Sequence, residues 1–96
     1  MARALKKLAT LKLRLYIAGN APNSLRAIEN LRAFCSVAFL DCHEIEIVDL
    51  LKDPTRALAD RVIVTPTLIR LRPLPALRVI GNLSDTNQLK LSLGRG

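Results

Sequence analysis

The segment over residues 11–24 constrains the fold of this chain more than any other segment. Its first part alternates between apolar and polar side chains, and this period of two predicts a strand with one buried face. The apolar positions are Leu11, Leu13, Leu15 and Ile17, and the positions between them are Lys12, Arg14, Tyr16 and Ala18. The sequence Gly-Asn-Ala-Pro then ends the strand, and Asn23 or Ser24 is expected to cap a helix that follows.

The residues after this turn carry apolar side chains at three- and four-residue spacing, which is typical of an amphipathic helix ending near Phe39. These apolar positions are Leu25, Ile28, Leu31, Phe34, Cys35 and Ala38. Ile45, Ile47 and Val48 then mark a second strand. A strand, a helix and a strand at this spacing predict two parallel strands joined by a crossover helix.

The pattern after residue 50 is less decisive. Asp53 followed by Pro54 favours the start of a short helix that ends near Arg61. The remaining expected elements are strands over 68–72 and 77–80 and a last helix that begins at Ser84 and Asp85 and carries Leu89, Leu91 and Leu93. Local preference also permits other assignments over 62–72 and 77–93, so this half of the chain stays ambiguous between helix and strand.

Ninety-six residues, half of them hydrophobic, are enough for one domain with one core. We expect a basic N-terminal arm over 1–10 and one α/β domain over 11–96. The net charge of +7 attracts nucleic acid, anionic membranes and acidic proteins alike, so its sign does not select a partner. Nucleic-acid binding is disfavoured because the sequence lacks aromatic stacking pairs and zinc-ligand spacing.

No apolar run approaches the roughly 18 residues that a membrane-spanning helix needs, and Lys12 and Arg14 interrupt any signal-peptide core. A cytoplasmic protein is therefore expected. Cys35 and Cys42 fit neither a redox motif nor a zinc pair, which favours free thiols in a reducing compartment. His43 has no evident catalytic or metal-binding partner, so we expect no catalytic residue, metal or cofactor.

The expected order of elements is that of a thioredoxin-like domain. A redox protein of this layout would carry Cys-x-x-Cys at the start of its first helix, whereas residues 21–24 contain no cysteine. The proline before the third strand is usually cis in this fold, so a cis peptide bond is expected between Thr65 and Pro66. The sequence therefore predicts a thioredoxin-like fold with a binding function in place of redox chemistry, and no enzyme activity.

Four short segments, in order, resemble the KaiB family of circadian clock proteins. They are LRLYIAGNAPNS over 13–24, DLLKDP over 49–54, VTPTL over 64–68 and IGNLS over 80–84. The resemblance implies a clock or timer component that binds the ring-shaped hexameric ATPase KaiC and regulates its phosphorylation cycle. It also implies KaiA or an output histidine kinase as a further partner, and a homo-oligomer, a tetramer or dimer, as the ground state.

The resemblance further implies a switch between two folds of one sequence, a thioredoxin-like form that binds the ATPase and a ground state of order βαββααβ. Basic family positions that contact the ATPase match Arg26, Arg61, Arg70 and Arg78. Positions expected to shape turns or take part in the switch are Gly19, Asn20, Pro22, Asn23, Pro66, Pro73, Pro75 and Gly81. Leu74 interrupts the proline run that is usual in the family. The alternatives are a family member in stress adaptation without a circadian role, and a basic nucleic-acid-binding module.

Overall fold

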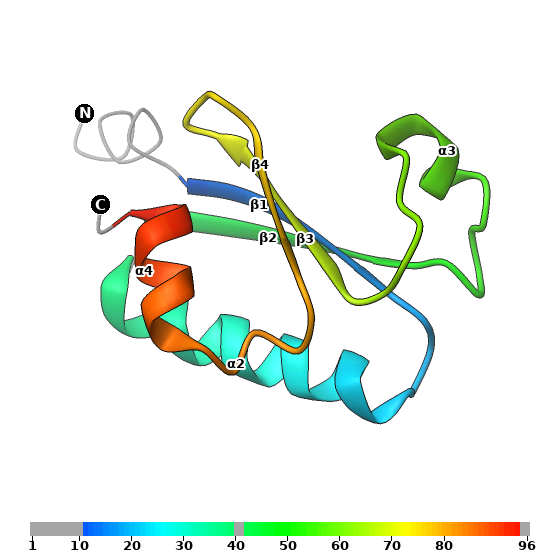
Figure 1. The fold of residues 1–96 in the computed structure, drawn as a ribbon, viewed down its shortest axis with the longest axis horizontal. Coiled ribbons are helices and arrows are strands. Elements are labelled where there is room, and N and C mark those ends of the chain that lie inside the picture. Colours follow the sequence, from blue (N-terminus) through cyan, green and yellow to red (C-terminus); the bar gives the residue numbers. More distant parts are fainter. Residues whose placement is uncertain (1–10, 40–41, 95–96) are drawn as a thin grey trace.

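The computed structural model describes residues 11–39 and 42–94. In this part of the chain the elements are β1 (Leu11–Ile17), α2 (Pro22–Ala38), β2 (His43–Asp49), α3 (Arg56–Asp60), β3 (Thr67–Arg72), β4 (Leu77–Ile80) and α4 (Thr86–Leu93). Helices α2 and α4 cover one face of the sheet, and α3 lies on the other side (Figure 1). The expected order of elements is confirmed, and this structure does not have the alternative order βαββααβ. The predicted basic arm lies outside the described residues.

The sheet has the strand order β2-β1-β3-β4. Strands β1 and β2 are parallel, with Leu11 opposite His43, and this confirms the predicted parallel pair. Strand β3 runs antiparallel to both β1 and β4. The parallel direction of β1 and β2 follows from the crossover helix α2 between them, whereas the short turn between β3 and β4 requires an antiparallel pair.

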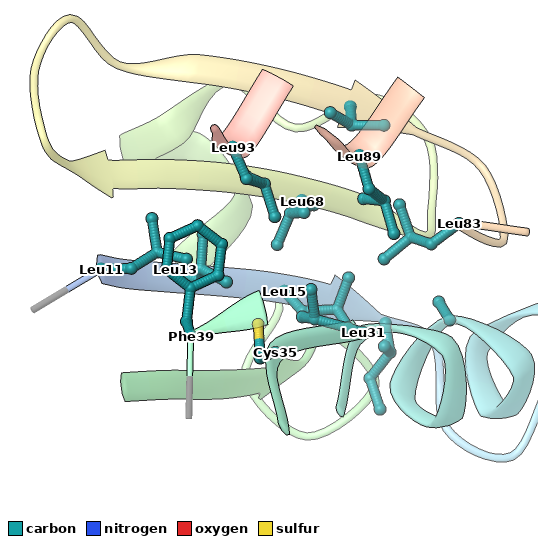
Figure 2. Packing of buried hydrophobic residues seen from close by; sticks show 13 residues of the cluster. Leu11, Leu13, Leu15, Leu31, Cys35, Phe39, Leu68, Leu83, Leu89 and Leu93 are labelled. Atoms are coloured by element: carbon teal, nitrogen blue, oxygen red, sulfur yellow. The ribbon is translucent and has the colours of Figure 1, made fainter. Parts of the chain in front are cut away.

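The main core lies between the sheet and the two helices α2 and α4. The apolar face of β1 is buried there, as its alternating pattern predicts. Figure 2 shows these side chains facing Leu31 and Cys35 of α2 and Leu89 and Leu93 of α4. Leu91, which we expected on the apolar side of the last helix, is exposed because it lies on the helix face opposite Leu89 and Leu93.

The other face of the sheet has a smaller core that the alternation did not predict. Tyr16, placed among the polar positions of β1, has no exposed surface and packs with Val48 and Ile69. Its phenol ring lies beneath α3, where its hydroxyl oxygen is 3.3 Å from the main-chain carbonyl of Arg56. The prediction of one buried face was therefore wrong at Tyr16, because a helix from a distant part of the chain covers that end of the sheet.

Two details of the first helix differ from the prediction. α2 begins at Pro22, and neither Asn23 nor Ser24 is its N-cap. Proline suits this first position because its fixed φ is helical and its missing N–H would have no partner there. The hydroxyl of buried Ser24 instead accepts a hydrogen bond from the N–H of Ala18 (3.1 Å). Leu25 is 46% exposed, because the buried stripe runs through the smaller Ser24 and Ala27.

The later helices agree with the prediction in part. α3 begins at Arg56, after a turn over Asp53 and Pro54, so the predicted start was too early. Asp85 is the N-cap of α4, and its carboxylate accepts from the N–H of Gln88 (3.1 Å). The Thr65–Pro66 peptide bond is cis, as expected, and so are the bonds before Pro73 and Pro75.

Candidate partner-binding surface

The structure brings together two of the four arginines that the sequence marks for a partner. Arg78 on β4 donates to the main-chain carbonyls of Asp60 and, at 3.2 Å, of Arg61. Arg61 directly follows α3 and adopts the left-handed conformation, with φ of 52°. The last carbonyls of a helix lack partners within the helix, so the Arg78 guanidinium satisfies the C-terminal end of α3. The exposed side chain of Arg61 is left at the surface beside it.

The other two arginines lie elsewhere. Arg26 is exposed on α2. Arg70 on β3 donates to the carbonyl of Ser92 in α4 (2.9 Å) and to that of Pro75 (2.7 Å). Arg70 therefore joins the end of α4 and the turn after β3 to the sheet. This intramolecular contact was missed by the sequence analysis, because residues 70, 75 and 92 meet only after folding.

Exposed apolar residues flank Arg61 and Arg78 along the chain. Leu58 of α3 is 78% exposed, Ile63 after α3 is 93% exposed, and Ile80 at the end of β4 is 61% exposed. Val64 is 45% exposed. Burial of large apolar side chains away from water lowers the free energy, so a group of them on one surface is a candidate interaction site. We call the set Leu58, Arg61, Ile63, Val64, Arg78 and Ile80 the α3 surface.

Hydrogen bonds hold the parts of the α3 surface together. The carbonyl of Val64 accepts from the hydroxyl of Thr67 (2.6 Å), and Thr67 is the register partner of Ile80. The N–H of Gly81 donates to the carbonyl of Pro66 (3.0 Å). The segment after α3 is thus fixed beside the end of β4. Gly81, with φ of 116°, provides a backbone conformation that other residues adopt only with strain.

A network of charged side chains lies beneath α3. Arg14 donates to Glu46 (2.7 Å) and to Asp60 (3.0 Å), and Arg56 donates to Glu46 (3.0 Å). The hydroxyl of Tyr16 donates to Oδ2 of Asp60 (2.5 Å), which is the oxygen that also accepts from Arg14. Arg14 and Glu46 are register partners on neighbouring parallel strands, so folding of the sheet alone brings them together.

These contacts shift the pKa values of the network. The hydrogen bonds from Tyr16 and Arg14 hold the pKa of the Asp60 carboxyl below its usual value. The hydrogen bonds from Arg14 and Arg56 lower the pKa of the Glu46 carboxyl. Burial is the main cause that raises the pKa of the Tyr16 phenol, and its hydrogen bond to Asp60 adds to the rise. The acids are therefore charged and the phenol is protonated at neutral pH, which is the state that these hydrogen bonds need.

The turn after β1 contains several of the predicted turn and switch residues. Gly19 has φ of 54°, and its N–H donates to the carboxylate of Asp49 (2.9 Å). The same Asp49 oxygen accepts from the N–H of Leu51 (3.0 Å), so one side chain holds the turns after β1 and β2. These two N–H donors lower the pKa of Asp49. Asn20, Pro22 and Asn23 are exposed around this turn, and their predicted part in a switch stays a prediction.

The remaining candidate chemical groups are the cysteines and the histidine. Cys35 is buried, which raises the pKa of its thiol to about 11, and Cys42 is a second free thiol, as predicted. Nδ1 of His43 lies 3.0 Å from the carbonyl of Phe39. Over residues 11–39 and 42–94, no three His, Cys, Asp or Glu side chains gather as metal ligands. No helix of the same ranges is long and apolar enough to cross a membrane.

Comparison with solved structures shows the fold. The chain superimposes on thioredoxin from Fasciola hepatica with a TM-score of 0.72 and 16% identity, over 98% of this chain and 86% of the other. The N-terminal domain of SasA from Synechococcus elongatus gives a TM-score of 0.71 with 22% identity, over 91% of this chain and 86% of the other. The fold is therefore thioredoxin-like.

Comparison of sequences shows the family. The chain is 42% identical over 81 residues to the circadian clock oscillator protein KaiB of Synechococcus elongatus, which covers 84% of this chain and 79% of the relative. The KaiB protein of Prochlorococcus marinus is also 42% identical over 81 residues, covering 84% of this chain and 68% of the relative. The sequence pattern of the KaiB domain matches residues 14–95. The chain therefore belongs to the KaiB family.

Proposed function

We propose that this chain is a non-enzymatic clock or timer component that binds a KaiC-type hexameric ATPase and regulates its phosphorylation cycle. Membership of a family whose relatives are named circadian clock oscillator proteins is the observation that carries the proposal. The α3 surface supports it physically, because apolar side chains beside an exposed arginine suit a protein partner with an acidic rim. KaiA or an output kinase is the further partner that we propose for the bound form.

The net charge of +7 is compatible with an acidic partner face. Arg61 is placed to pair with a carboxylate, since the planar guanidinium binds carboxylates through two parallel hydrogen bonds. The guanidinium of Arg78 already bonds two main-chain carbonyls, so we assign it the part of holding the surface. Arg26 and Arg70 stay proposed contact residues, and Arg70 would first have to leave its carbonyl partners.

We also propose that the thioredoxin-like form described here is the ATPase-binding form and exchanges with an oligomeric ground state. If the binding form is populated at about 1%, its apparent affinity falls about a hundredfold, which corresponds to roughly 2.7 kcal/mol. Two packings of one sequence can differ by this amount. A single set of amide resonances, unchanged by the ATPase, would contradict the exchange.

The test of ATPase binding is gel filtration with light scattering. The protein is measured alone and after long incubation with its cognate KaiC-type ATPase and nucleotide. A saturable shift into a complex of ring size is expected. The absence of any shift would contradict the proposed partner.

One charge-reversing variant and one apolar variant, each with a matched control, then locate the interface. Arg61→Glu should abolish the shift, whereas Arg32→Glu, which reverses an exposed arginine on α2 outside the α3 surface, should not. Ile63→Ser should weaken binding, and Val37→Ser is its matched control because Val37 is 83% exposed on α2. Equal effects of the test and control variants would place the interface elsewhere.

The net charge is also compatible with one other function, which is nucleic-acid binding. It would appear as tight binding of generic DNA or RNA that weakens steeply with salt. A KaiC-type partner would instead give a fixed stoichiometry that depends on the nucleotide state. The two functions are therefore separated by one salt titration.

A further inference from the structure

The five-residue helix α3 depends on the sheet for its position. It has no buried residue and no side-chain hydrogen bond at its N-cap. A helix of one or two turns is unstable alone, because forming the first turn costs more conformational entropy than its hydrogen bonds return. The contacts that join α3 to the sheet must therefore determine where Leu58 and the residues after α3 lie.

The C-terminal end of α3 is held through Asp60. Its carboxylate oxygen accepts from the hydroxyl of Tyr16 (2.5 Å) and from Arg14 (3.0 Å), both on β1. Its main-chain carbonyl accepts from Arg78 on β4. The donor on Tyr16 is fixed in place, because its ring is fully buried between Val48 and Ile69. Asp60 thus connects α3 to two strands that are separated by β3.

The N-terminal end of α3 is held through the same network. Arg56 donates to Glu46 (3.0 Å), and Glu46 accepts from Arg14 at 2.7 Å. Arg14 therefore lies between the two ends of the helix and contacts both acidic partners. The Arg14–Asp60 bond is partly buried, whereas both bonds to Glu46 are exposed. The contacts at Asp60 are therefore the stronger part of the network.

We infer that Tyr16 and Asp60 are positioning residues of the α3 surface, which hold α3 in the orientation that a protein partner binds. This inference rests on the proposed function for the identity of the partner. Neither side chain needs to touch that partner, since Tyr16 is buried and the Asp60 carboxylate faces the sheet. Their effect on binding passes through the placement of Leu58, Arg61 and Ile63.

The first test is hydrogen exchange of the full chain. Tyr16→Phe removes only the hydroxyl and keeps the buried ring, so the fold is retained. The amides of Leu58, Arg61 and Val62, which bond within α3 and its end, should exchange about tenfold faster. Amides of β1 and β3 should keep their protection. Asp60→Asn, which keeps the shape of the side chain, should have the same effect.

A matched control separates this effect from a general loss of charge. Asp53→Asn changes an exposed carboxylate that accepts from the hydroxyl of Thr55 and lies outside the network. It should leave exchange in α3 unchanged. Unchanged exchange of α3 in both Tyr16→Phe and Asp60→Asn would overturn the inference.

The second test is the affinity for the KaiC-type ATPase. Tyr16→Phe should bind several-fold more weakly and Asp53→Asn as tightly as the unaltered protein, because only the fraction with docked α3 binds. Arg61→Glu should weaken binding without faster exchange in α3. Faster exchange with unchanged affinity would overturn the inference while the proposed function stands. If the unaltered protein does not bind the ATPase, the proposed function fails, and the exchange result still decides whether Tyr16 and Asp60 hold α3.

Discussion

Gly19 offers the sharpest test of how a single backbone position supports this fold. Its φ of 54° is strained for any residue with a Cβ, at a cost of roughly 1–2 kcal/mol. Alanine also restricts the unfolded chain, which returns about 0.5–1 kcal/mol. An added Cβ would lie 2.7 Å from Cδ1 of Leu51, but Leu51 is 72% exposed and can move away. Gly19→Ala should therefore reduce the free energy of unfolding by about 1 kcal/mol.

Urea denaturation measures this change, and the melting temperature should fall by about 4–8 °C in a domain of this size. The variant Leu51→Ala is the control, alone and combined with Gly19→Ala. If the strained backbone of residue 19 lowers the free energy of unfolding, Gly19→Ala should lower it equally in the Leu51→Ala background. A loss that disappears there would mean that the contact with Leu51 causes it. No loss in either background would refute the argument from φ.

Three further predictions concern other parts of the structure. Asp85→Ala removes the N-cap of α4 and should cost about 1 kcal/mol in urea denaturation, whereas Asp53→Ala, which caps no helix, should cost less. The hydrogen bonds from Tyr16 and Arg14 lower the pKa of folded Asp60, so its stabilisation is present above the ordinary pKa of about 4 and is lost as the pH falls through the lowered value. Melting temperatures between neutral and acidic pH should therefore fall less steeply for Asp60→Asn, and parallel curves would exclude this contribution. Burial raises the pKa of the Cys35 thiol to about 11, so iodoacetamide at neutral pH should label Cys42 before Cys35 in the folded protein, as read by mass spectrometry; equal labelling would contradict the buried position.

The first half of the fold could be predicted from the sequence because its patterns are local. The alternation in β1 and the three- and four-residue spacing in α2 each specify one element and its buried face. The predicted start of α2 was too late along the chain. α2 begins at Pro22 because proline fills the first helical position, and Ser24 is buried because its hydroxyl has a partner in the turn.

The candidate site was predicted less well. The sequence marked Arg61 and Arg78, and the structure places them side by side. It gave no sign of the apolar members of the α3 surface, because Ile63 and Val64 lie in a connection without periodicity. The network beneath α3 was also missed, since Tyr16 and Asp60 are 44 residues apart and only their pairing reveals a role.

The sequence by itself therefore determined the strand, helix and strand of the first half, the apolar face of β1, the absence of a Cys-x-x-Cys motif and the resemblance to the KaiB family. These depend on residues that are neighbours along the chain or on short motifs. Only the tertiary structure decided the burial of Tyr16, the carbonyl partners of Arg70 and the composition of the α3 surface. Each of these depends on which distant segment covers a given side chain, and that is fixed by the packing of the whole domain.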